Sequence, residues 1–169
     1  MRSRAATVLA ALVLGSSWVA RAEGCPEHLF TVARSKNSNI VVYDAKLDAS
    51  GDLDAAGPVE SYWILNADRG QREELNRVER ERAYGVDVVP GPEPRTFALT
   101  FKANKKRKFA LRMRDGCAVV LAEIDGHEAV LSRIFVKSKE GGLTPTVEEI
   151  TVSGSDASTG APVRETFAP

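Results

Sequence analysis

Short runs of apolar residues, separated by turn-forming residues, make up most of the chain from residue 29 onward. Several runs alternate apolar and polar positions, which is the pattern of a strand with one buried face. Gly, Pro, Asn and Asp recur between the runs at intervals of about 8 to 12 residues, a spacing typical of an all-β sandwich or barrel. The predicted strands are residues 29–34, 39–45, 59–65, 86–89, 96–102, 108–114, 118–124, 129–137, 147–153 and 163–167.

The strongest turn signal is the Asp-Gly pair at residues 115–116, because these residue types readily adopt the positive φ angles of a two-residue type I′ hairpin. A turn at this point places Met113 opposite Ala118 and makes one face of the hairpin wholly apolar. A second Asp-Gly pair at residues 125–126 turns the chain again. Together the two turns predict a three-stranded meander.

One segment, residues 69–83, departs from the strand pattern and predicts a helix. Asp68 is a candidate N-cap with Gln71 three residues after it, and Gly85 is placed to end the helix. The apolar stripe of this helix is narrow and consists of Leu75, Val78 and Ala83. A narrow stripe indicates a helix on the surface of the β core.

The pattern as a whole predicts a mainly β protein, an antiparallel β-barrel or a closely related β-sandwich with one surface α-helix. We favour the barrel, because many strands with few long connections leave edges that closure of the sheet would protect.

Residues 1–22 have the parts of a secretory signal peptide: a basic start, an apolar run and small residues before an Ala-x-Ala cleavage site. The apolar run is about half the roughly 20 residues that a membrane span requires. We therefore expect an exported protein with no transmembrane span in the mature chain. The remaining residues, 23–169, have the length of a single β-rich domain.

Cys25 and Cys117 are the only cysteines of the chain, and export would bring them to an oxidising compartment. A disulfide between them would close a long loop and contribute roughly 4 to 5 kcal/mol in the chain-entropy model. Two alternatives are free thiols and a lipid anchor on Cys25, since residues 22–25 faintly resemble a lipoprotein cleavage box. The charged Glu23 within that box argues against the anchor.

Composition narrows the possible functions. The chain carries 23 basic and 23 acidic residues, a balance that excludes a dedicated nucleic-acid binder, and its 43% hydrophobic content excludes a disordered chain. Two His and two Cys leave little material for metal cages or His-based catalysis, and no catalytic motif of a known hydrolase or metalloprotease is present. We predict no cofactor, no metal and no catalytic residue, although a pair of carboxylates acting on a glycosidic bond would leave no mark in the sequence.

Four residues are candidates for ligand binding. Tyr62 and Trp63 are neighbours in a predicted strand, so their rings point to opposite faces and one of them would line the interior of a barrel. Arg80 and Tyr84 lie where the helix returns to the sheet, and the planar guanidinium of Arg80 suits an anion. The alternative is structural: core packing for the first pair, and a salt bridge with an aromatic residue closing the helix for the second.

Two charged segments have a weaker claim to function. The first is a predicted basic loop, formed by Lys102, Lys105, Lys106, Arg107 and Lys108. Such a patch attracts polyanions, but a charged hairpin tip that prevents aggregation is the alternative. The second is an acidic loop, formed by Asp48, Ser50, Asp52 and Asp54. Its spacing departs from that of an EF-hand, because Leu53 stands where Gly is required, so the loop predicts a turn.

Several segments carry a resemblance to a known family: residues 34–44, 59–64, 74–75, 79–80, 83–85, 123–126 and 131–136. In this order they resemble a bacterial family of exported proteins classified as a domain of unknown function, DUF family 4833. The likeness extends from about residue 29 to residue 167, and the basic segment around Lys105 has no counterpart in it. The resemblance implies an exported bacterial domain, in the periplasm or outside the cell, and implies no activity, cofactor or catalytic residue.

The sequence thus favours a non-catalytic domain that binds a small or amphiphilic ligand, with Tyr62 or Trp63 as apolar contact and Arg80 and Tyr84 as polar contacts. The first alternative is an envelope module that binds a protein or a polyanion. The second is a carboxylate-based hydrolase. The sequence specifies neither the ligand or partner nor the oligomeric state.

Overall fold

The computed structural model describes residues 25–139 and 146–169, apart from the side chain of Ala67. The predicted signal peptide lies outside the described residues. In chain order the elements are β1 (His28–Arg34), β2 (Asn37–Ala45), β3 (Val59–Leu65), a 3₁₀ turn (Asn66–Asp68), β4 (Gln71–Glu74), α1 (Arg77–Arg82), β5 (Val86–Pro90), β6 (Thr96–Phe101), β7 (Asn104–Arg114), β8 (Cys117–Ile124), β9 (His127–Lys139), β10 (Thr146–Asp156) and β11 (Pro162–Phe167).

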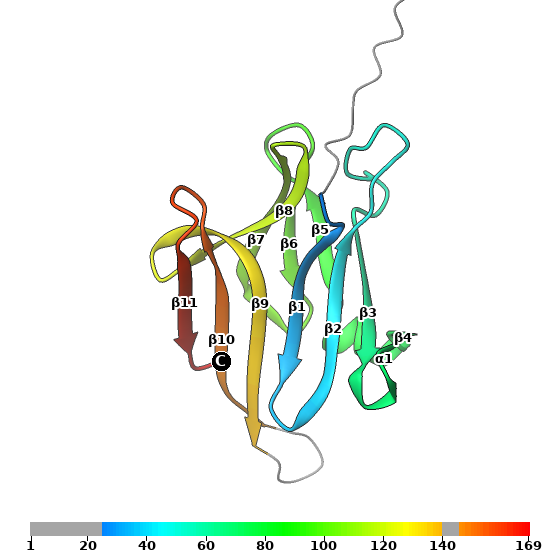
Figure 1. Cartoon of the computed structure of the whole chain (residues 1–169), viewed down its shortest axis with the longest axis vertical. Helices are drawn as coiled ribbons and strands as arrows, with labels where there is room; N and C mark the ends of the chain where they lie inside the picture. Colours follow the sequence, from blue (N-terminus) through cyan, green and yellow to red (C-terminus); the bar gives the residue numbers. More distant parts are fainter. Residues whose placement is uncertain (1–24, 140–145) are drawn as a thin grey trace, which may run out of the picture.

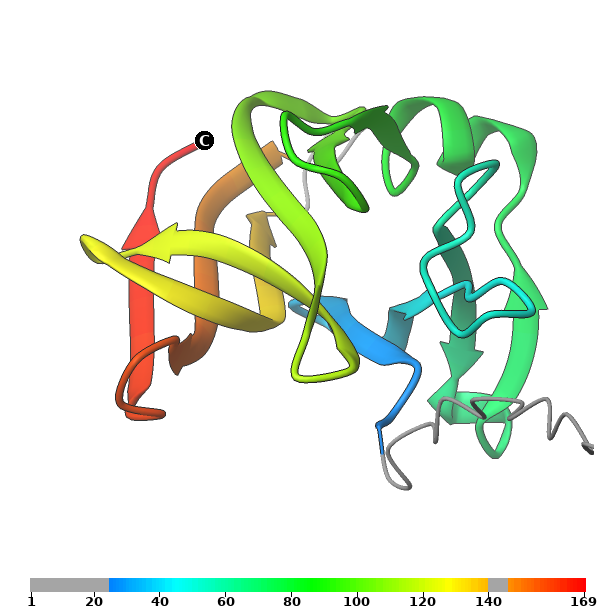
Figure 2. The same cartoon turned by 90° about the horizontal axis from the view of Figure 1, so that it is seen from above.

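All the described strands belong to one 11-stranded sheet. Its order is β4-β3-β2-β1-β9-β8-β7-β6-β5, and the β10–β11 hairpin joins this path through β9. The sheet curls into a half-barrel, most of whose strands run roughly vertically in Figure 1 and whose curled outline is seen from above in Figure 2. The prediction of a mainly β fold with a minor helix is confirmed.

Strand β9 joins the parts of the sheet. It is antiparallel to β8 at one end and parallel to β1 at the other, and β10 runs antiparallel along nearly all of it. The sheet is antiparallel as predicted except at the β1–β9 pair, which is the one parallel pair among the described strands. A parallel pair needs a long crossover, and the chain makes it through β2 to β8.

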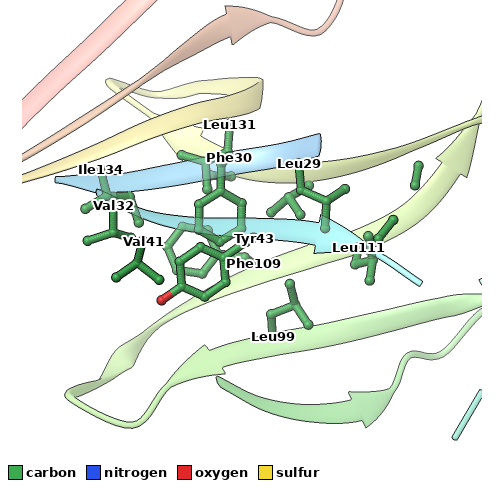
Figure 3. Packing of buried hydrophobic residues seen from close by; sticks show 14 of the residues in the cluster. Leu29, Phe30, Val32, Val41, Tyr43, Leu99, Phe109, Leu111, Leu131 and Ile134 are labelled. Carbon is green, nitrogen blue, oxygen red and sulfur yellow. The ribbon is translucent and has the colours of Figure 1, made fainter. Parts of the chain in front are cut away.

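The core lies between the two sides of the curled sheet, where β1 and β2 face β6 and β7 (Figure 3). The rings of Phe30 and Tyr43 stack with centroids 4.5 Å apart, and Phe101 meets Tyr43 edge-on at 5.6 Å. The buried Tyr43 hydroxyl donates a hydrogen bond to the carbonyl of Tyr84 at 2.6 Å, so its polar end is satisfied. This bond ties the segment after α1 to the core.

The predicted strands all appear in the structure, with ends that differ by a few residues. The turn at residues 115–116 gives the expected hairpin, since Met113 pairs with Ala118 and both Asp115 and Gly116 have positive φ. The prediction placed the basic segment in a loop, which is wrong: the chain turns at residues 102–103, and Lys105 to Lys108 lie within β7. Strand β7 is therefore longer than predicted.

The predicted helix at residues 69–83 is largely wrong. The chain turns at Arg69 and Gly70, which have φ of 62° and 78°, and returns along β3 as the exposed strand β4. The helix α1 begins later, capped by Asn76, whose side chain accepts from the Glu79 amide while the Glu79 carboxylate accepts from the Asn76 amide. The capping box is therefore Asn76/Glu79 instead of the predicted Asp68/Gln71 pair.

Cys25 and Cys117 form a disulfide, with Cα atoms 5.3 Å apart and a sequence separation of 92. It joins the start of the described chain to the β7–β8 hairpin. Among the described residues, no helix combines the length and the apolar character needed to cross a membrane.

Candidate functional site

A largely apolar cavity of about 570 Å³ opens at one end of the half-barrel. The C-terminal ends of β1, β9 and β11 meet there with the start of β7 and β10 and with Tyr84, which follows α1. In Figure 1 this is the lower end of the molecule, where β1 and β9 finish and the C-terminus lies. The cavity exists because the curled sheet leaves its inner face uncovered at this end.

Two rows of side chains across β1, β9 and β10 form one wall. The inner row is Val32, Ile134 and Val152, which are paired across the three strands. The outer row lies two residues nearer the cavity mouth and is Arg34, Val136 and Ile150, paired in the same way. Because residues two apart in a strand share a face, both rows point into the cavity, and all six side chains line it.

Four aromatic residues contribute to the remaining walls. Phe101 and Phe109 come from β6 and β7 with ring centroids 5.7 Å apart, and Phe167 comes from the end of β11. Tyr84, which is only 8% exposed, closes the side next to α1. No Asp or Glu side chain of the described residues lines the cavity.

Four cationic side chains are placed at the mouth: Arg34, Lys105, Lys106 and Arg107. Arg107 is already engaged, because its guanidinium donates to Glu165 at 2.7 Å and to the carbonyl of Glu123. Within the described residues, Arg34, Lys105 and Lys106 form no ion pair. Lys105 and Lys106 are exposed, whereas Arg34 is half-buried.

The guanidinium of Arg34 lies 5.7 Å from the centroid of the Tyr84 ring. Burial raises the pKa of the Tyr84 hydroxyl, the positive charge of Arg34 opposes this rise, and the Glu79 carboxylate adds to it. Tyr84 therefore stays a neutral phenol, able to donate one hydrogen bond, with a cation beside it.

Trp63 supports Tyr84 from behind. Its ring meets the Tyr84 ring edge-on with centroids 4.9 Å apart, and its indole nitrogen donates to the Glu79 carboxylate at 3.1 Å. Trp63 is buried in the core and does not line the cavity. Its role is to hold the ring of Tyr84, which does line the cavity.

Tyr62 and Arg80 lie away from the cavity. The Tyr62 hydroxyl donates to Asp44 at 2.5 Å, and Arg72 covers its ring at 3.7 Å. Burial and the hydrogen bond to Asp44 raise the pKa of Tyr62 to about 12. The exposed Arg80 donates to the carbonyl of Leu75 at 3.0 Å, in a structural role at the start of α1. The structure thus brings together Trp63 and Tyr84 but neither Tyr62 nor Arg80.

Sequence reasoning did not single out Arg34, although a signal for it was present. Phe30, Val32 and Arg34 occupy alternate positions of β1, and the first two are buried in the core. A cation in the third position of an inward-facing series is unusual for a plain core strand. The pairing with β9 that completes the site was not readable from the sequence.

A second hollow, of about 800 Å³, lies at the opposite end and is polar. His127 Nδ1 lies 2.9 Å from Asp156, whose pKa is well below its usual range because Ser158 and Thr159 donate hydrogen bonds to it. A carboxyl held ionised in this way is a poor proton donor. The cations in this hollow are also engaged: Arg95 with Asp52, Arg112 with Glu128, and Arg114 with the carbonyl of Ala157.

The acidic loop forms a turn, as predicted. The Asp48 carboxylate accepts from the amide of Ser50 at 2.8 Å, from the Ser50 hydroxyl at 2.6 Å and from the amide of Asp52 at 3.1 Å. All three bonds go to Oδ1, and they lower the pKa of Asp48. The described residues contain no group of three or more His, Cys, Asp or Glu side chains suited to a metal ion.

Comparison with family models gives one match, to the domain of unknown function DUF4833, over residues 30–166. The chain belongs to the DUF4833 family. The matched region runs from β1 into β11 and so contains both rows of the cavity wall. Neither the curated proteins nor the solved structures contain a significant match to the chain.

Proposed function

We propose that this DUF4833 protein is a non-catalytic binding protein that holds the apolar part of a small amphiphilic molecule in the cavity between β1, β7, β9 and β10. The observation that carries the proposal is a cavity of about 570 Å³ with apolar walls and a few polar groups at its mouth. Small-molecule sites have volumes of roughly 300–1,000 Å³ and this same distribution of polar groups. Each methylene group buried there contributes about 0.8 kcal/mol.

In this proposal the two rows of the β1–β9–β10 wall and the three Phe side chains contact the apolar part of the ligand. Tyr84 closes one side of the cavity, and Trp63 keeps its ring in place through their edge contact. Of the four residues that the sequence suggested, Tyr84 is thus the direct contact and Trp63 its support. Tyr62 and Arg80 have no part in it.

The proposal is tested with the neutral fluorescent probe N-phenyl-1-naphthylamine, whose emission rises in apolar surroundings. We compare the wild type with Val147→Trp, which adds an indole to the partly buried β10 residue that lines the cavity. The matched control is Val89→Trp, on the edge strand β5, where the side chain is 55% exposed and outside the cavity.

We expect saturable binding to the wild type and to Val89→Trp, and binding at least about tenfold weaker to Val147→Trp, because the indole occupies space that the probe needs. Absence of saturable binding to the wild type would overturn the proposal. Equal binding by all three proteins would place the probe elsewhere and would also overturn it.

A second candidate function is binding of an envelope polyanion by the exposed lysines near the start of β7, two of which, Lys105 and Lys106, also lie at the mouth of the cavity. Its support is that Lys105, Lys106 and Lys108 are all exposed and form no ion pair within the described residues. This function predicts salt-sensitive retention on a dextran sulfate column that is lost when the three lysines are replaced by Ser. Retention unchanged by the replacement would remove this candidate.

We also infer that the protein is exported through residues 1–22 and that residues 23–169 form its single mature domain. The disulfide supports this inference, because such bonds persist in oxidising compartments. The intact mass of the protein purified from the cells that produce it tests the inference. A mass that begins at Glu23 supports it, and a mass that includes Met1 contradicts it.

A further inference from the structure

We infer that the ligand carries an anionic oxyacid group, a carboxylate or a phosphate, at the end of a single apolar chain, and that Arg34 is the residue that selects it. This inference rests on the proposed function and adds to it the ligand class and the specificity-determining residue.

The position of Arg34 gives the first argument. Arg34, Val136 and Ile150 are paired across β1, β9 and β10, two residues beyond the wholly apolar row of the same wall. In the apolar row, β1 contributes Val32. In the row nearer the mouth, it contributes a guanidinium instead. A molecule lying along this wall therefore meets hydrocarbon over most of its length and one cation at its end.

The state of the Arg34 charge gives the second argument. Arg34 is half-buried, and within the described residues it has no ion pair. Its guanidinium lies over the face of the Tyr84 ring. Glu79 is the acid whose charge raises the pKa of Tyr84. Its carboxylate already accepts hydrogen bonds from the indole of Trp63 and the amide of Asn76. A partly desolvated guanidinium without a counter-ion is costly, and two oxygen atoms of a carboxylate or a phosphate satisfy it by accepting two parallel hydrogen bonds.

The other cations have different roles. Arg107 is bound to Glu165 and to the carbonyl of Glu123, so it is not available to a ligand. Lys105 and Lys106 are exposed at the mouth, where their charge attracts an anion from solution without fixing its orientation. Arg34 is the cation that lines the cavity, is partly buried and has no ion pair among the described residues.

The cavity has room for one acyl chain. At roughly 30 Å³ for a water-sized group, a cavity of about 570 Å³ holds on the order of twenty such groups. That is enough for a twelve-carbon chain with its head group.

The test is displacement of N-phenyl-1-naphthylamine by four molecules with the same twelve-carbon chain: dodecanoate, dodecyl phosphate, dodecanol and dodecyltrimethylammonium. It is run below the concentrations at which these molecules form micelles. For each protein we measure the concentration of dodecanol that displaces half of the probe and divide it by the corresponding concentration of each anion. A variant that weakens the binding of all these molecules equally leaves this ratio unchanged. The variants are Arg34→Gln and Arg34→Lys, and the matched control is Lys108→Gln, which removes an exposed β7 charge outside the cavity lining.

We expect at least one of the two anions to displace the probe from the wild type and from Lys108→Gln at concentrations about tenfold or more below dodecanol, because a hydrogen bond to a charged group adds at least that much. The ratio falls towards one in Arg34→Gln and is intermediate in Arg34→Lys, which keeps the charge but loses the bidentate geometry. Preference for dodecanoate or for dodecyl phosphate distinguishes a carboxylate from a phosphate head group.

Two results would overturn the inference while leaving the proposed function intact. One is displacement of the bound probe by dodecanol, or by dodecyltrimethylammonium, as effectively as by both anions. The other is an anion preference that persists in Arg34→Gln. Failure of the proposed function looks different, because the probe itself then does not bind.

Discussion

At the scale of single residues, the most informative feature is a charge where packing alone would place a methyl group. Arg34 continues the inward-facing series of β1 after Phe30 and Val32 and lies among apolar cavity residues. A protein under selection for stability alone would have an aliphatic side chain there. Functional sites are often retained at such a cost to stability.

The first prediction follows from this cost. Replacing Arg34 by Leu is expected to raise the free energy of unfolding by up to about 1 kcal/mol, because it removes an unpaired, partly buried charge. Replacing Arg107 by Leu is expected to lower it by about 2 kcal/mol, because Glu165 and the carbonyl of Glu123 lose their donor. Urea denaturation of both variants checks the pair. If Arg34→Leu destabilises the protein as much as Arg107→Leu, Arg34 has a structural role.

A second prediction concerns Gly85, at the point where the chain leaves α1. A Cβ atom on Gly85 would lie 1.8 Å from the carbonyl oxygen of Arg80, and the backbone would have to move. We expect Gly85→Ala to cost more than about 2 kcal/mol of stability. We also expect it to weaken probe binding, because Gly85 directly follows Tyr84, which lines the cavity. In Gly57→Ala the added atom meets nothing within 4 Å, so this control should unfold like the wild type in urea.

At the scale of elements, the edge strand β11 is linked to the sheet beyond β10 by side-chain contacts. Strand β11 pairs only with β10 among the described strands. Arg107 ties it to β7 and β8 by binding Glu165, and its guanidinium lies 5.1 Å from the centroid of the Phe167 ring. Since Phe167 lines the cavity, this contact also positions one of the cavity walls.

The third prediction is the pH dependence of this attachment. The hydrogen bond from Arg107 lowers the pKa of Glu165, with a further contribution from the amide of Asp125. A lowered pKa means that the stabilisation is complete above the ordinary pKa of glutamate, about 4.3, and is lost as the pH falls through the lower folded value. Glu165→Gln should therefore be less stable than the wild type at pH 7, and the difference should shrink below about pH 4. Urea denaturation at both pH values measures it, and a difference independent of pH would contradict the assignment.

The sequence predicts the elements far better than their assembly. Alternating apolar positions and the two Asp-Gly turns locate the strands, because these are local signals. The segment from 69 to 83 misleads because β4 is an exposed edge strand whose charged residues mimic a surface helix, and the left-handed turn at Arg69 and Gly70 gives no strong local signal. The candidate site depends on pairing between β1 and β9, about a hundred residues apart, so the sequence offers Tyr84 and misses Arg34.

At the scale of the whole molecule, one covalent link and one curled sheet fix the shape of the cavity. The disulfide holds the start of β1 against the β7–β8 hairpin, at the end of the sheet opposite the cavity. The two sides of the half-barrel that meet in the core are thereby joined at one end and left open at the other.

The fourth prediction concerns this link. The double variant Cys25→Ser, Cys117→Ser is expected to lose about 4 to 5 kcal/mol of unfolding free energy, since the bond closes a loop of 92 residues. Denaturation in urea measures the loss, with the wild type under reducing conditions as the second comparison. A loss below about 1 kcal/mol in both the double variant and the reduced wild type would show that the sheet holds the N-terminal segment without the disulfide.

The central claim is that the cavity, and neither the exposed face of β7 nor the polar hollow, receives an anionic amphiphile. The most direct measurement is a titration of the ¹⁵N-labelled protein with dodecanoate and, in a second sample, with dodecyl phosphate, followed residue by residue through the backbone amide signals. With at least one of the two anions, the account predicts saturable shifts at Arg34, Tyr84, Val136 and Ile150, with little change at His127 and Asp156 in the polar hollow. Shifts confined to Lys108 on the exposed face of β7, or to the polar hollow, or no shifts with either anion, would contradict it.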